Sequence, residues 1–399
     1  MTSDAPLSVG LYTYSTQPRG SVVHCASLAD ALVAQGHSVT VYALAKPGSE
    51  SFFRALEAQL VLIACEPAPA DLAQLIEQRI SEFARCVREL SPMHDVHHAQ
   101  DCLAANALLR GRPRRGAVVR TVHHVEHFES SSLEQYQMRS ICDSDLVLSV
   151  SETTQNDVQR HYGVRSERVN NGVEQSRFER PAKAAVAQLR TRLGLGDASP
   201  VMVSFGGIAP RKNTLRLLDA FLSLRCRVPS ARWLLVGGAS ILEHSVYRDE
   251  FERRLTRASA ADQRAVVCTG ILSDAEVAAS YGLADVVASP SLREGFGLCA
   301  LEALAAGVPL VASRRAPFTE YLDDDCALLV DPEDGNQLLS ALERALSSEG
   351  QSARIQAGIE RARGFCWSRV ADEHQQLYRA LVAGVPARAF RAGAARFRN

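Results

Sequence analysis

The sequence lacks the features that mark several specialised classes of protein. Its ten cysteines are scattered singly and form no C-x-x-C pair, which argues against a zinc site and a disulfide framework. Lysine and arginine together number 44 and aspartate and glutamate 45, so no excess of positive charge points to nucleic acid. No apolar run approaches the roughly 20 residues of a membrane span. The N-terminal M-T-S-D-A-P also lacks the segments of a signal peptide. We therefore expect a cytoplasmic protein with reduced thiols.

What the sequence does contain is a regular alternation of strands and helices. With 399 residues, 46% hydrophobic and 22% charged, it has the composition of a soluble globular protein of two domains. In the second half, helical patterns separate six apolar runs that predict strands: Val201–Phe205, Trp233–Gly237, Val266–Ile271, Asp285–Ser289, Leu310–Ser313 and Ala327–Asp331. This alternation predicts parallel strands with helices on both faces.

The first half of the chain follows the same pattern. The predicted strands are Leu7–Tyr14, His37–Leu44, Asp95–His98, Ala117–His124, Leu146–Ser151 and a short strand around Val169. The predicted helices are Ser21–Gln35, Ser51–Leu60, Leu72–Leu90, Ser132–Cys142 and Glu152–Tyr162. The predicted fold class is therefore α/β, with two doubly wound, Rossmann-like domains facing a central cleft.

One stretch combines a helix start with two carboxylates. The strand ending at Ser289 leads into a polar loop, then Gly295 and Gly297, then a Leu/Ala-rich helix. The free N–H groups and the dipole at such a helix start favour an anion. Glu294 precedes the glycines and Glu302 lies within the helix, and ionised carboxylates accept hydrogen bonds from hydroxyl groups. A phosphate between two hydroxyl-binding acids describes a sugar nucleotide.

Spacing bears on the role of these two glutamates. Eight helical residues would separate them by roughly 12 Å, whereas paired glycosidase carboxylates lie about 5–9.5 Å apart. We therefore expect Glu294 and Glu302 to bind the two ends of one ligand. The alternative is structural, with one glutamate near the helix dipole and the other on a solvent-exposed face.

A second candidate site follows the strand Val201–Phe205. Two glycines, Gly206 and Gly207, come directly after it, and the basic pair Arg211 and Lys212 precedes a predicted helix. Glycines allow close approach of a backbone to a ligand, and two cations near a helix start suit a diphosphate. The alternative is a loop with solvated basic residues.

The first half offers weaker candidates. Gly20 lies where a loop enters the first helix, either near a ligand or simply in a turn. His123 ends a predicted strand. His123, Glu126 and His127 would suit a metal only if they converged, and residues four apart at the end of a strand do not, so we expect no metal.

The string R-E-G-F-G-L-C-A-L-E-A-L-A-A-G-V-P closely resembles the E-x7-E signature of glycosyltransferase family 4, whose members are retaining enzymes of the GT-B fold. L-A-D-A-L-V-A-Q-G-H-S-V-T-V is similar to the first βαβ unit of that family. V-N-N-G-V-E-Q-S-R-F is similar to the turn that closes its N-terminal domain. The resemblance covers essentially the whole chain and implies the GT-B fold.

The resemblance also implies residue roles. The family motif G-R-L-x-x-x-K-G holds the donor diphosphate; Lys212 matches its lysine, but Gly207 stands at its arginine position, and we expect Arg211 to supply the missing charge. His123 matches the T-x-H motif near the donor sugar, and backbone around Ile271 is expected near the nucleotide base. The residues expected to bind substrate are Gly20, Gly206, Gly207, Arg211, Lys212, Ile271, Glu294, Gly295, Phe296, Gly297, Leu298 and Glu302. The residues expected to act in catalysis are His123, Arg211, Lys212 and Glu294.

The same patterns divide the chain. We expect an acceptor-side domain over residues 1–182, a nucleotide-sugar-binding domain over 183–365, a closing helix over 366–385 that crosses back to the first domain, and a basic tail over 386–399. The tail interleaves arginines with phenylalanines. It is either a frayed, solvated terminus or a weak contact with an anionic membrane surface.

The sequence therefore predicts a metal-independent, retaining glycosyltransferase. Its donor would be a nucleoside-diphosphate sugar and its acceptor a small molecule, a glycan or a lipid-linked molecule, with no further cofactor and no nucleic-acid partner. Two alternatives keep the fold: a nucleotide-sugar epimerase, and a non-catalytic sugar-nucleotide binding protein suggested by Gly207. The sequence does not identify the donor base, the sugar or the acceptor.

Overall fold

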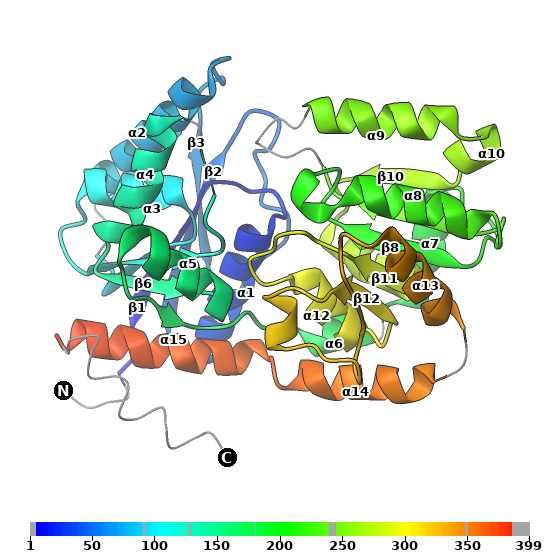
Figure 1. The fold of residues 1–399 in the computed structure, drawn as a ribbon. Helices are drawn as coiled ribbons and strands as arrows, with labels where there is room; N and C mark the ends of the chain where they lie inside the picture. The colour runs from blue at the N-terminus through cyan, green and yellow to red at the C-terminus, as the bar shows by residue number, and fades with distance from the viewer. Residues whose placement is uncertain are drawn as a thin grey trace. The chain divides into compact units, whose positions relative to one another are not determined.

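The computed structural model describes residues 5–90, 93–126, 128, 130–179, 181–238, 245–347 and 350–384. By its internal contacts the chain divides into two compact units (Figure 1). The N-terminal unit contains the residues up to Gly172 and the segment from Trp367 onward, and the C-terminal unit contains Val173–Cys366. Each unit has its own parallel sheet.

The boundary between the two units lies between Gly172 and Val173. The boundary expected from the sequence lies later in the chain, between residues 182 and 183. The backbone N–H of Val173 donates to the carbonyl of Phe365 (2.6 Å), and Val173 pairs with Cys366 in a parallel bridge. The helix α6 (Gln175–Glu179) then packs against helices of the C-terminal unit. These are contacts between segments distant in sequence, so local composition does not reveal them.

The sheet of the N-terminal unit has seven parallel strands in the order β3-β2-β1-β4-β5-β6-β7. The strands are β1 (Ser8–Thr13), β2 (Ser38–Ala45), β3 (Gln59–Ala64), β4 (Val96–Ala99), β5 (Ala117–Val122), β6 (Leu146–Ser149) and β7 (Glu167–Arg168). The helices are α1 (Gly20–Ala34), α2 (Leu72–Leu90), α3 (Cys102–Gly111), α4 (Ser131–Cys142), α5 (Glu152–Tyr162) and α15 (Trp367–Val382). The strand order reverses between β1 and β4, and ligands of doubly wound sheets bind at such a switch point.

Helices cover both faces of this sheet. On one face, α1 and α15 pack together and share a core with Val9 and Val119 of the strands. On the other face, α2 and α3 share a core with Tyr12 and Tyr42. Because a parallel strand is buried on both faces, it needs a continuous apolar run rather than an alternating one. The strand β1 shows this, since all its residues after Ser8 are buried.

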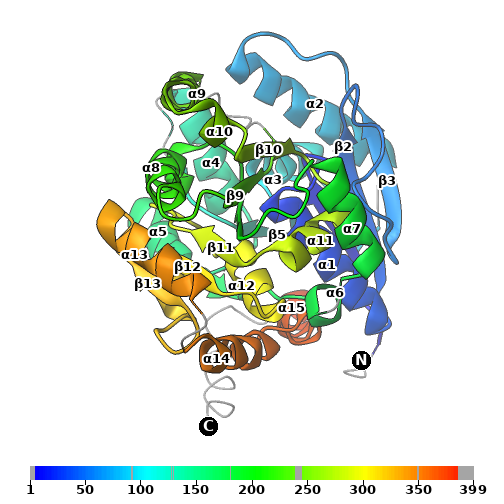
Figure 2. The same cartoon turned by 90° about the vertical axis from the view of Figure 1, so that its right-hand side faces the viewer.

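The sheet of the C-terminal unit has six parallel strands in the order β10-β9-β8-β11-β12-β13. The strands are β8 (Val201–Phe205), β9 (Arg232–Val236), β10 (Val266–Gly270), β11 (Val286–Ser289), β12 (Leu310–Ser313) and β13 (Leu328–Val330). Besides α6, the helices are α7 (Lys183–Arg192), α8 (Thr214–Arg225), α9 (Ser245–Arg257), α10 (Ala260–Gln263), α11 (Asp274–Leu283), α12 (Leu298–Ala305), α13 (Gly335–Leu346) and α14 (Gln351–Arg363), with short 3-10 turns at η1 (Pro210–Lys212) and η2 (Phe318–Glu320). Figure 2 shows α8 and α13 on one side of the sheet and α7 and α11 on the other.

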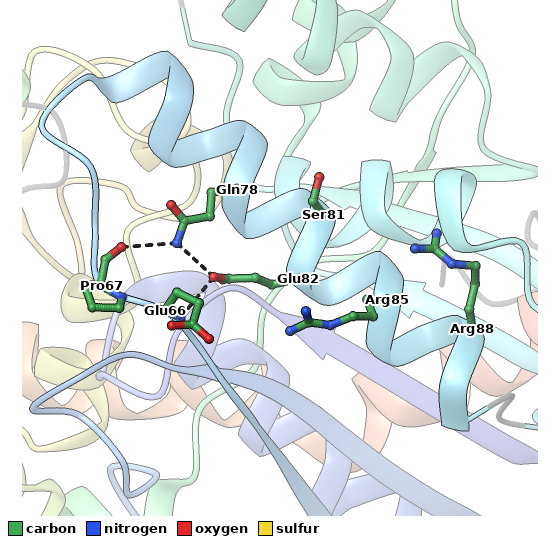
Figure 3. A pocket seen from close by; sticks show the side chains of 7 residues that line it. All are labelled: Glu66, Pro67, Gln78, Ser81, Glu82, Arg85 and Arg88. Carbon is green, nitrogen blue, oxygen red and sulfur yellow. Dashed lines mark hydrogen bonds between the residues drawn. The ribbon is translucent and has the colours of Figure 1, made fainter.

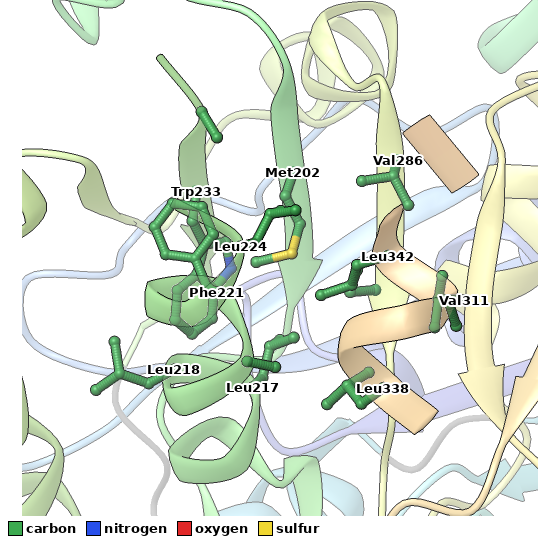
Figure 4. Close-up of a cluster of buried hydrophobic side chains, with 14 of the residues drawn as sticks. Met202, Leu217, Leu218, Phe221, Leu224, Trp233, Val286, Val311, Leu338 and Leu342 are labelled. Atoms are coloured by element: carbon green, nitrogen blue, oxygen red, sulfur yellow. The ribbon is translucent and has the colours of Figure 1, made fainter. Parts of the chain in front are cut away.

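The best-defined core of the C-terminal unit lies under α8 and α13 (Figure 4). The helix α8 buries Leu217, Phe221 and Leu224, which are three or four residues apart and therefore lie on one helical face. Trp233 of β9 is fully buried against Phe221, with ring centroids 5.7 Å apart. This packing holds β8 and its following loop on a rigid base.

The predicted α/β class with two doubly wound sheets is confirmed. The predicted strands of the second half agree with β8 to β13 within one residue at either end, and α2 and α5 have the predicted bounds. One predicted helix is wrong. Residues 51–58 are not helical, and Gln59–Ala64 is the edge strand β3. Phe52 and Phe53 pack into the core as loop residues, and the backbone N–H of Phe53 donates to the carbonyl of Thr16. Tertiary contacts thus override the local helical pattern.

Two further sequence-based expectations concern membranes. The basic tail, residues 386–399, lies outside the described residues. Within the described ranges, no helix combines the length and apolarity needed to cross a bilayer.

Candidate functional site

The carboxyl edge of the C-terminal sheet brings two predicted sites together. Strands β8 and β11 are neighbours at the point where the strand order reverses. The loop after β8 carries the basic pair, and the loop after β11 leads to α12. The backbone N–H groups of Leu292 and Arg293 both point to the carbonyl of Arg211, at 2.8 and 3.3 Å. The two loops are therefore tied by main-chain hydrogen bonds at a switch point.

Three predicted residues form one charged group, which we call the Arg211–Lys212–Glu294 cluster. The Lys212 ammonium donates to Glu294 Oε2 at 2.5 Å, and Arg211 Nη1 donates to Glu294 Oε1 at 3.1 Å. The side chains of Lys212 and Glu294 are 10% and 13% exposed, whereas Arg211 is 43% exposed. The cluster therefore presents one accessible guanidinium above a largely buried ion pair.

Steric contacts explain why the two positions after β8 are glycines. Gly206 has φ +105°, and a Cβ there would lie 2.5 Å from Cε of Lys212. Gly207 has φ +68°, and a Cβ there would lie 2.7 Å from the carbonyl oxygen of Gly238. Left-handed backbone and close contact both disfavour any side chain at these positions. In this backbone position 207 cannot carry an arginine, so the positive charge of the loop comes from Arg211 and Lys212.

The start of α12 lies where the sequence places it. Gly297, with φ +93°, is the N-cap, and no side chain caps the first turn, which begins at Leu298. A Cβ on Gly297 would lie 2.4 Å from the Phe318 ring. Tyr321 supports the loop, because its hydroxyl donates to the carbonyls of Phe296 and Gly297 at 3.0 and 3.1 Å. The first-turn N–H groups are thus held in position for an anion.

Gly295 and Phe296 complete the predicted loop. The Phe296 side chain is buried and stacks on Tyr321, with ring centroids 4.9 Å apart. Its contribution to a ligand site would therefore come from the main chain.

Glu302 lies one and a half turns into α12 and is half-buried. The hydroxyl of Tyr281 donates to Glu302 Oε2 at 2.7 Å. Burial raises the pKa of Glu302, while the Tyr281 hydrogen bond and the charge of Arg177 act in the opposite direction. Tyr281 is itself fully buried and stacks on Phe205 at 4.6 Å between centroids. Nothing in the sequence marks Tyr281 as a site residue, since it lies in the last turn of the apolar helix α11.

Ile271 follows β10 at the same edge of the sheet. Its side chain is 55% exposed. A Cβ on Gly238 would lie 2.9 Å from Ile271 Cγ1, so the neighbouring glycine leaves room for it. The predicted contact of this position with a nucleotide base stays a prediction.

The other predicted residues belong to the N-terminal unit. Gly20 is the first residue of α1, after an N-cap residue whose side chain does not cap the helix. Nothing lies within 4 Å of a Cβ built on Gly20, so packing does not require a glycine. The structure leaves both interpretations of Gly20 open.

His123 lies directly after β5, next to other histidines. Its Nε2 and the side-chain oxygen of Gln100 are 3.1 Å apart, and its ring meets the edge of His24 at 4.9 Å. Burial, with smaller contributions from His24 and Arg120, lowers the pKa of His123 well below its ordinary value, so the ring is neutral at pH 7. His24 is fully buried and hydrogen-bonds Asn171 (2.8 Å), as a packed histidine does.

The metal alternative finds no geometric support. Within the described ranges, no group of three or more histidine, cysteine, aspartate or glutamate side chains is arranged to hold a metal ion. Glu126 is paired with His124 at 2.7 Å. His127 lies outside the described residues.

A separate hollow runs along α2 in the N-terminal unit (Figure 3). Within it, Glu82 accepts from Gln78 and from the backbone N–H of Glu66, and Arg85 and Arg88 are exposed. Because Glu82 is already hydrogen-bonded and the two arginines are exposed to solvent, the hollow does not indicate a particular ligand.

Two family models together cover both halves of the chain. The model described as Glycosyltransferase Family 4 matches residues 18–177, and the model described as Glycosyl transferases group 1 matches residues 186–362. The second match includes the Arg211–Lys212–Glu294 cluster and α12.

Curated relatives agree with these models. The chain is 30% identical over 344 residues to a GDP-mannose-dependent alpha-(1-6)-phosphatidylinositol monomannoside mannosyltransferase of Mycolicibacterium smegmatis, covering 80% of this chain and 84% of the relative. It is 27% identical over 390 residues to a D-inositol 3-phosphate glycosyltransferase of Corynebacterium diphtheriae, covering 90% of this chain and 89% of the relative. Among solved structures, HepE of Anabaena in complex with UDP and glucose has a TM-score of 0.74 and 19% identity, covering 93% of this chain and 99% of HepE. That similarity shows the GT-B fold.

Proposed function

The chain belongs to the glycosyltransferases of group 1 and family 4, and on this premise we propose that it transfers a sugar from a nucleoside-diphosphate sugar, with retention of configuration and without a metal ion. The observation that carries the proposal is the Arg211–Lys212–Glu294 cluster, which is tied to the loop before the uncapped start of α12. Cations and oriented N–H groups at one sheet edge suit a diphosphate.

Each group would take one part of the donor. The diphosphate accepts hydrogen bonds from Arg211, Lys212 and the first-turn amides of α12. Glu294, which forms ion pairs with both cations, would also accept hydrogen bonds from sugar hydroxyls. Glu302 would accept from the ribose diol, and the Tyr281 hydrogen bond would hold its carboxylate in one orientation.

The chemistry follows from the leaving group. The bond between the anomeric carbon and the diphosphate oxygen breaks, and the acceptor oxygen forms its bond to that carbon on the same face. The departing phosphate takes the acceptor proton, so no protein nucleophile is required. Arg211 and Lys212 would stabilise the charge that develops on the diphosphate, and such prearranged electrostatic groups often supply the largest part of catalysis. Neutral His123 would contribute a hydrogen bond to a sugar hydroxyl.

The donor is best sought with a thermal-shift panel, because a bound ligand raises the unfolding temperature according to its affinity. The panel contains GDP-mannose, named in the M. smegmatis relative, and UDP-glucose, whose components are present in the HepE structure, with ADP-glucose for comparison. We expect one nucleotide series to stabilise the wild type and to lose its effect in Lys212→Gln.

Transfer is then followed by NMR with the stabilising donor and a pool of acceptors. Retention predicts that the product has the anomeric configuration of the donor, and metal independence predicts unchanged turnover with EDTA. Inversion, loss of turnover with EDTA, or equal stabilisation of the Lys212→Gln variant would each contradict part of the proposal. Conversion of the donor without release of nucleoside diphosphate would indicate an epimerase.

A further inference from the structure

Lysine is scarce in this chain, and the position of each lysine is informative. Only three of its 44 basic residues are lysines: Lys46, Lys183 and Lys212. Lys183 is exposed at the start of α7, and Lys212 belongs to the donor cluster. Lys46 follows β2 at the carboxyl edge of the N-terminal sheet. Lysine differs from arginine in offering a compact charge on a flexible stem.

The Lys46 side chain is half-buried without a carboxylate partner. Its ammonium lies 5.0 Å from the centroid of the Tyr14 ring. Within the described ranges, no carboxylate lies at ion-pair distance and no hydrogen-bond acceptor contacts the ammonium. A cation–π contact attracts the ammonium but supplies no protein oxygen or nitrogen as an acceptor for its three N–H donors. The same ammonium is therefore available to a ligand.

A second cation in this region is also poorly compensated. Arg120 of β5 is 6% exposed, and its Nη1 donates to the carbonyl of Thr121. Its Nε is buried and has no hydrogen-bond partner in the described part of the chain. No described carboxylate forms an ion pair with Arg120 either. A buried guanidinium without a counter-ion is energetically costly unless a negative charge lies nearby.

Asp101, an acidic group that both cations influence, forms no ion pair with either of them in the described part of the chain. Asp101 lies close enough to Lys46 and Arg120 for both charges to lower its pKa, but burial is the larger effect and the pKa is raised overall. Its two oxygens accept from the backbone N–H groups of Ala104 and Tyr14, both at 2.8 Å. Asp101 therefore caps α3 and supports β1 without contacting either cation.

Two other arginines influence Lys46. Arg79 is matched by Glu82 in a buried ion pair at 2.6 Å. Burial, followed by the charges of Arg19 and Arg79, lowers the pKa of Lys46. The surroundings of Lys46 therefore disfavour its charged form, and a bound anion would stabilise it.

The location also favours a ligand. Tyr14 follows β1 and Asp101 follows β4, and these strands flank the switch point of the N-terminal sheet. Hydrogen bonds hold the surrounding loops together: Thr16 donates to the carbonyl of Ser49 (2.8 Å), and Gln17 donates to the Ser49 hydroxyl (2.6 Å). The cationic group is therefore held on ordered loops.

We propose that Lys46, at the carboxyl edge of the N-terminal sheet, binds a phosphate group of the acceptor substrate. Describing the ligand as the acceptor rests on the proposed glycosyl transfer. The shared chemistry is a phosphate ester on a hydroxylated molecule, either a soluble sugar or polyol phosphate or the headgroup of a lipid. A lysine suits such a group because its charge can follow the phosphate as the hydroxyl is oriented for attack.

The scarcity of lysine gives a direct experiment. Reductive methylation with carbon-13 formaldehyde keeps the positive charge of each lysine and labels three side chains besides the N-terminal amine. The signals are assigned with Lys46→Arg, Lys183→Arg and Lys212→Arg. Nucleoside diphosphate is added first, to saturation, and should shift the Lys212 signal. The probes that follow are inositol 3-phosphate, neutral inositol, and vesicles of phosphatidylcholine with or without phosphatidylinositol.

We expect a phosphate-bearing probe to shift the Lys46 signal while Lys183 stays unchanged. Lys46→Gln should weaken binding of that probe about tenfold or more, as expected for loss of a hydrogen bond to a charged group, while Lys183→Gln leaves it unchanged. A shift with inositol 3-phosphate indicates a soluble acceptor, and a shift only with phosphatidylinositol vesicles indicates a lipid headgroup.

Failure of this proposal can be distinguished from failure of the proposed donor site. No shift of Lys46 with any phosphate-bearing probe, or an equal shift with neutral inositol, would overturn the proposal even if Lys212 responds to nucleotide. Absence of a Lys212 response would instead count against the proposed donor site.

Discussion

At the scale of single residues, Gly207 and Arg211 distinguish this chain from the motif that its family resemblance implies. The backbone at Gly207 is left-handed and closed against the carbonyl of Gly238, so an arginine cannot occupy this position. Arg211 lies four residues later, shares Glu294 with Lys212 and remains partly exposed. Arg211 and Lys212 are thus the two cations of this loop, and the steric contact with Gly238 explains why position 207 carries no side chain.

Replacing Arg211 with alanine tests this interpretation. We expect Arg211→Ala to weaken donor binding by roughly 10- to 100-fold, the usual effect of losing a hydrogen bond to a charged group, with a further loss in turnover. Isothermal titration with the donor and steady-state kinetics measure the two effects. Arg257→Ala is the matched control, because Arg257 is exposed at the end of α9 in the same unit. Equal affinity in the two variants would remove Arg211 from the site.

Tyr281 is expected to act through Glu302. Because its hydrogen bond lowers the pKa of Glu302, Tyr281→Phe should raise that pKa further. The Glu302 carboxylate can accept hydrogen bonds from both hydroxyls of a diol only when it is ionised. Donor affinity therefore falls as the pH falls through the pKa of Glu302. The variant should therefore lose affinity at a higher pH than the wild type, with KM raised about fivefold or more at neutral pH. Donor KM from pH 4.5 to 8 measures the shift.

A control separates this effect from general destabilisation. Tyr247→Phe removes another hydroxyl of the same unit, one that accepts from the backbone N–H of Leu215 (3.0 Å), away from Glu302. It should leave the pH dependence of KM unchanged. If Tyr281→Phe also leaves it unchanged, Tyr281 has no role in orienting Glu302.

At the scale of elements, α15 meets α1 and the strands of the N-terminal unit through a layer of buried histidines. His374 of α15 lies beside His24 of α1 and His98 of β4, with ring centroids 6.0 and 5.7 Å away. Burial lowers the pKa of His24 to about 3 and that of His374 to about 4. The pKa of His98 is also well below its ordinary value, for the same main reason. The helix is therefore docked by neutral imidazoles.

This layer predicts acid sensitivity. In the unfolded chain these histidines titrate near pH 6.5, so below that pH the unfolded state binds protons that the folded state excludes. Stability is fully present above about pH 6.5 and is lost as pH falls toward 4, at about 1.4 kcal/mol per pH unit for each histidine. His374→Gln should reduce this slope by about one such contribution. Urea unfolding at pH 7, 6 and 5 gives the slopes, and identical slopes would refute the assignment.

At the scale of the whole molecule, the chain is two units with separate sheets and separate switch points. The proposed donor-binding residues Arg211, Lys212 and Glu302 belong to the C-terminal unit, and Lys46 and His123 belong to the N-terminal unit. Binding of a nucleoside diphosphate alone should therefore be local. We expect hydrogen exchange to slow at residues 205–214 and 289–303 and to stay unchanged around Lys46, as measured by mass spectrometry. Protection confined to the N-terminal unit would contradict the placement of the donor.

A feature of the fold or of the candidate site could be predicted from the sequence only where it depends on residues close together in the chain. The alternation of apolar strands with helices, the start of α12 after Gly297 and the basic pair after β8 are local patterns, and periodicity and turn chemistry report them directly. The residues 51–58 were predicted wrongly, because the packing of Phe52 and Phe53 as loop residues depends on other segments.

The sequence by itself therefore determined the fold class and the positions of the glycine-rich and basic loops at one edge of the sheet. Only the tertiary structure decided which residues meet there. Lys212 and Glu294 are 82 residues apart, and the contacts of Gly207 with Gly238 and of Tyr281 with Glu302 also join different elements. The uncompensated charge of Lys46 is likewise a property of everything packed around it. Such features depend on contacts distant along the chain, which no local pattern of residues records.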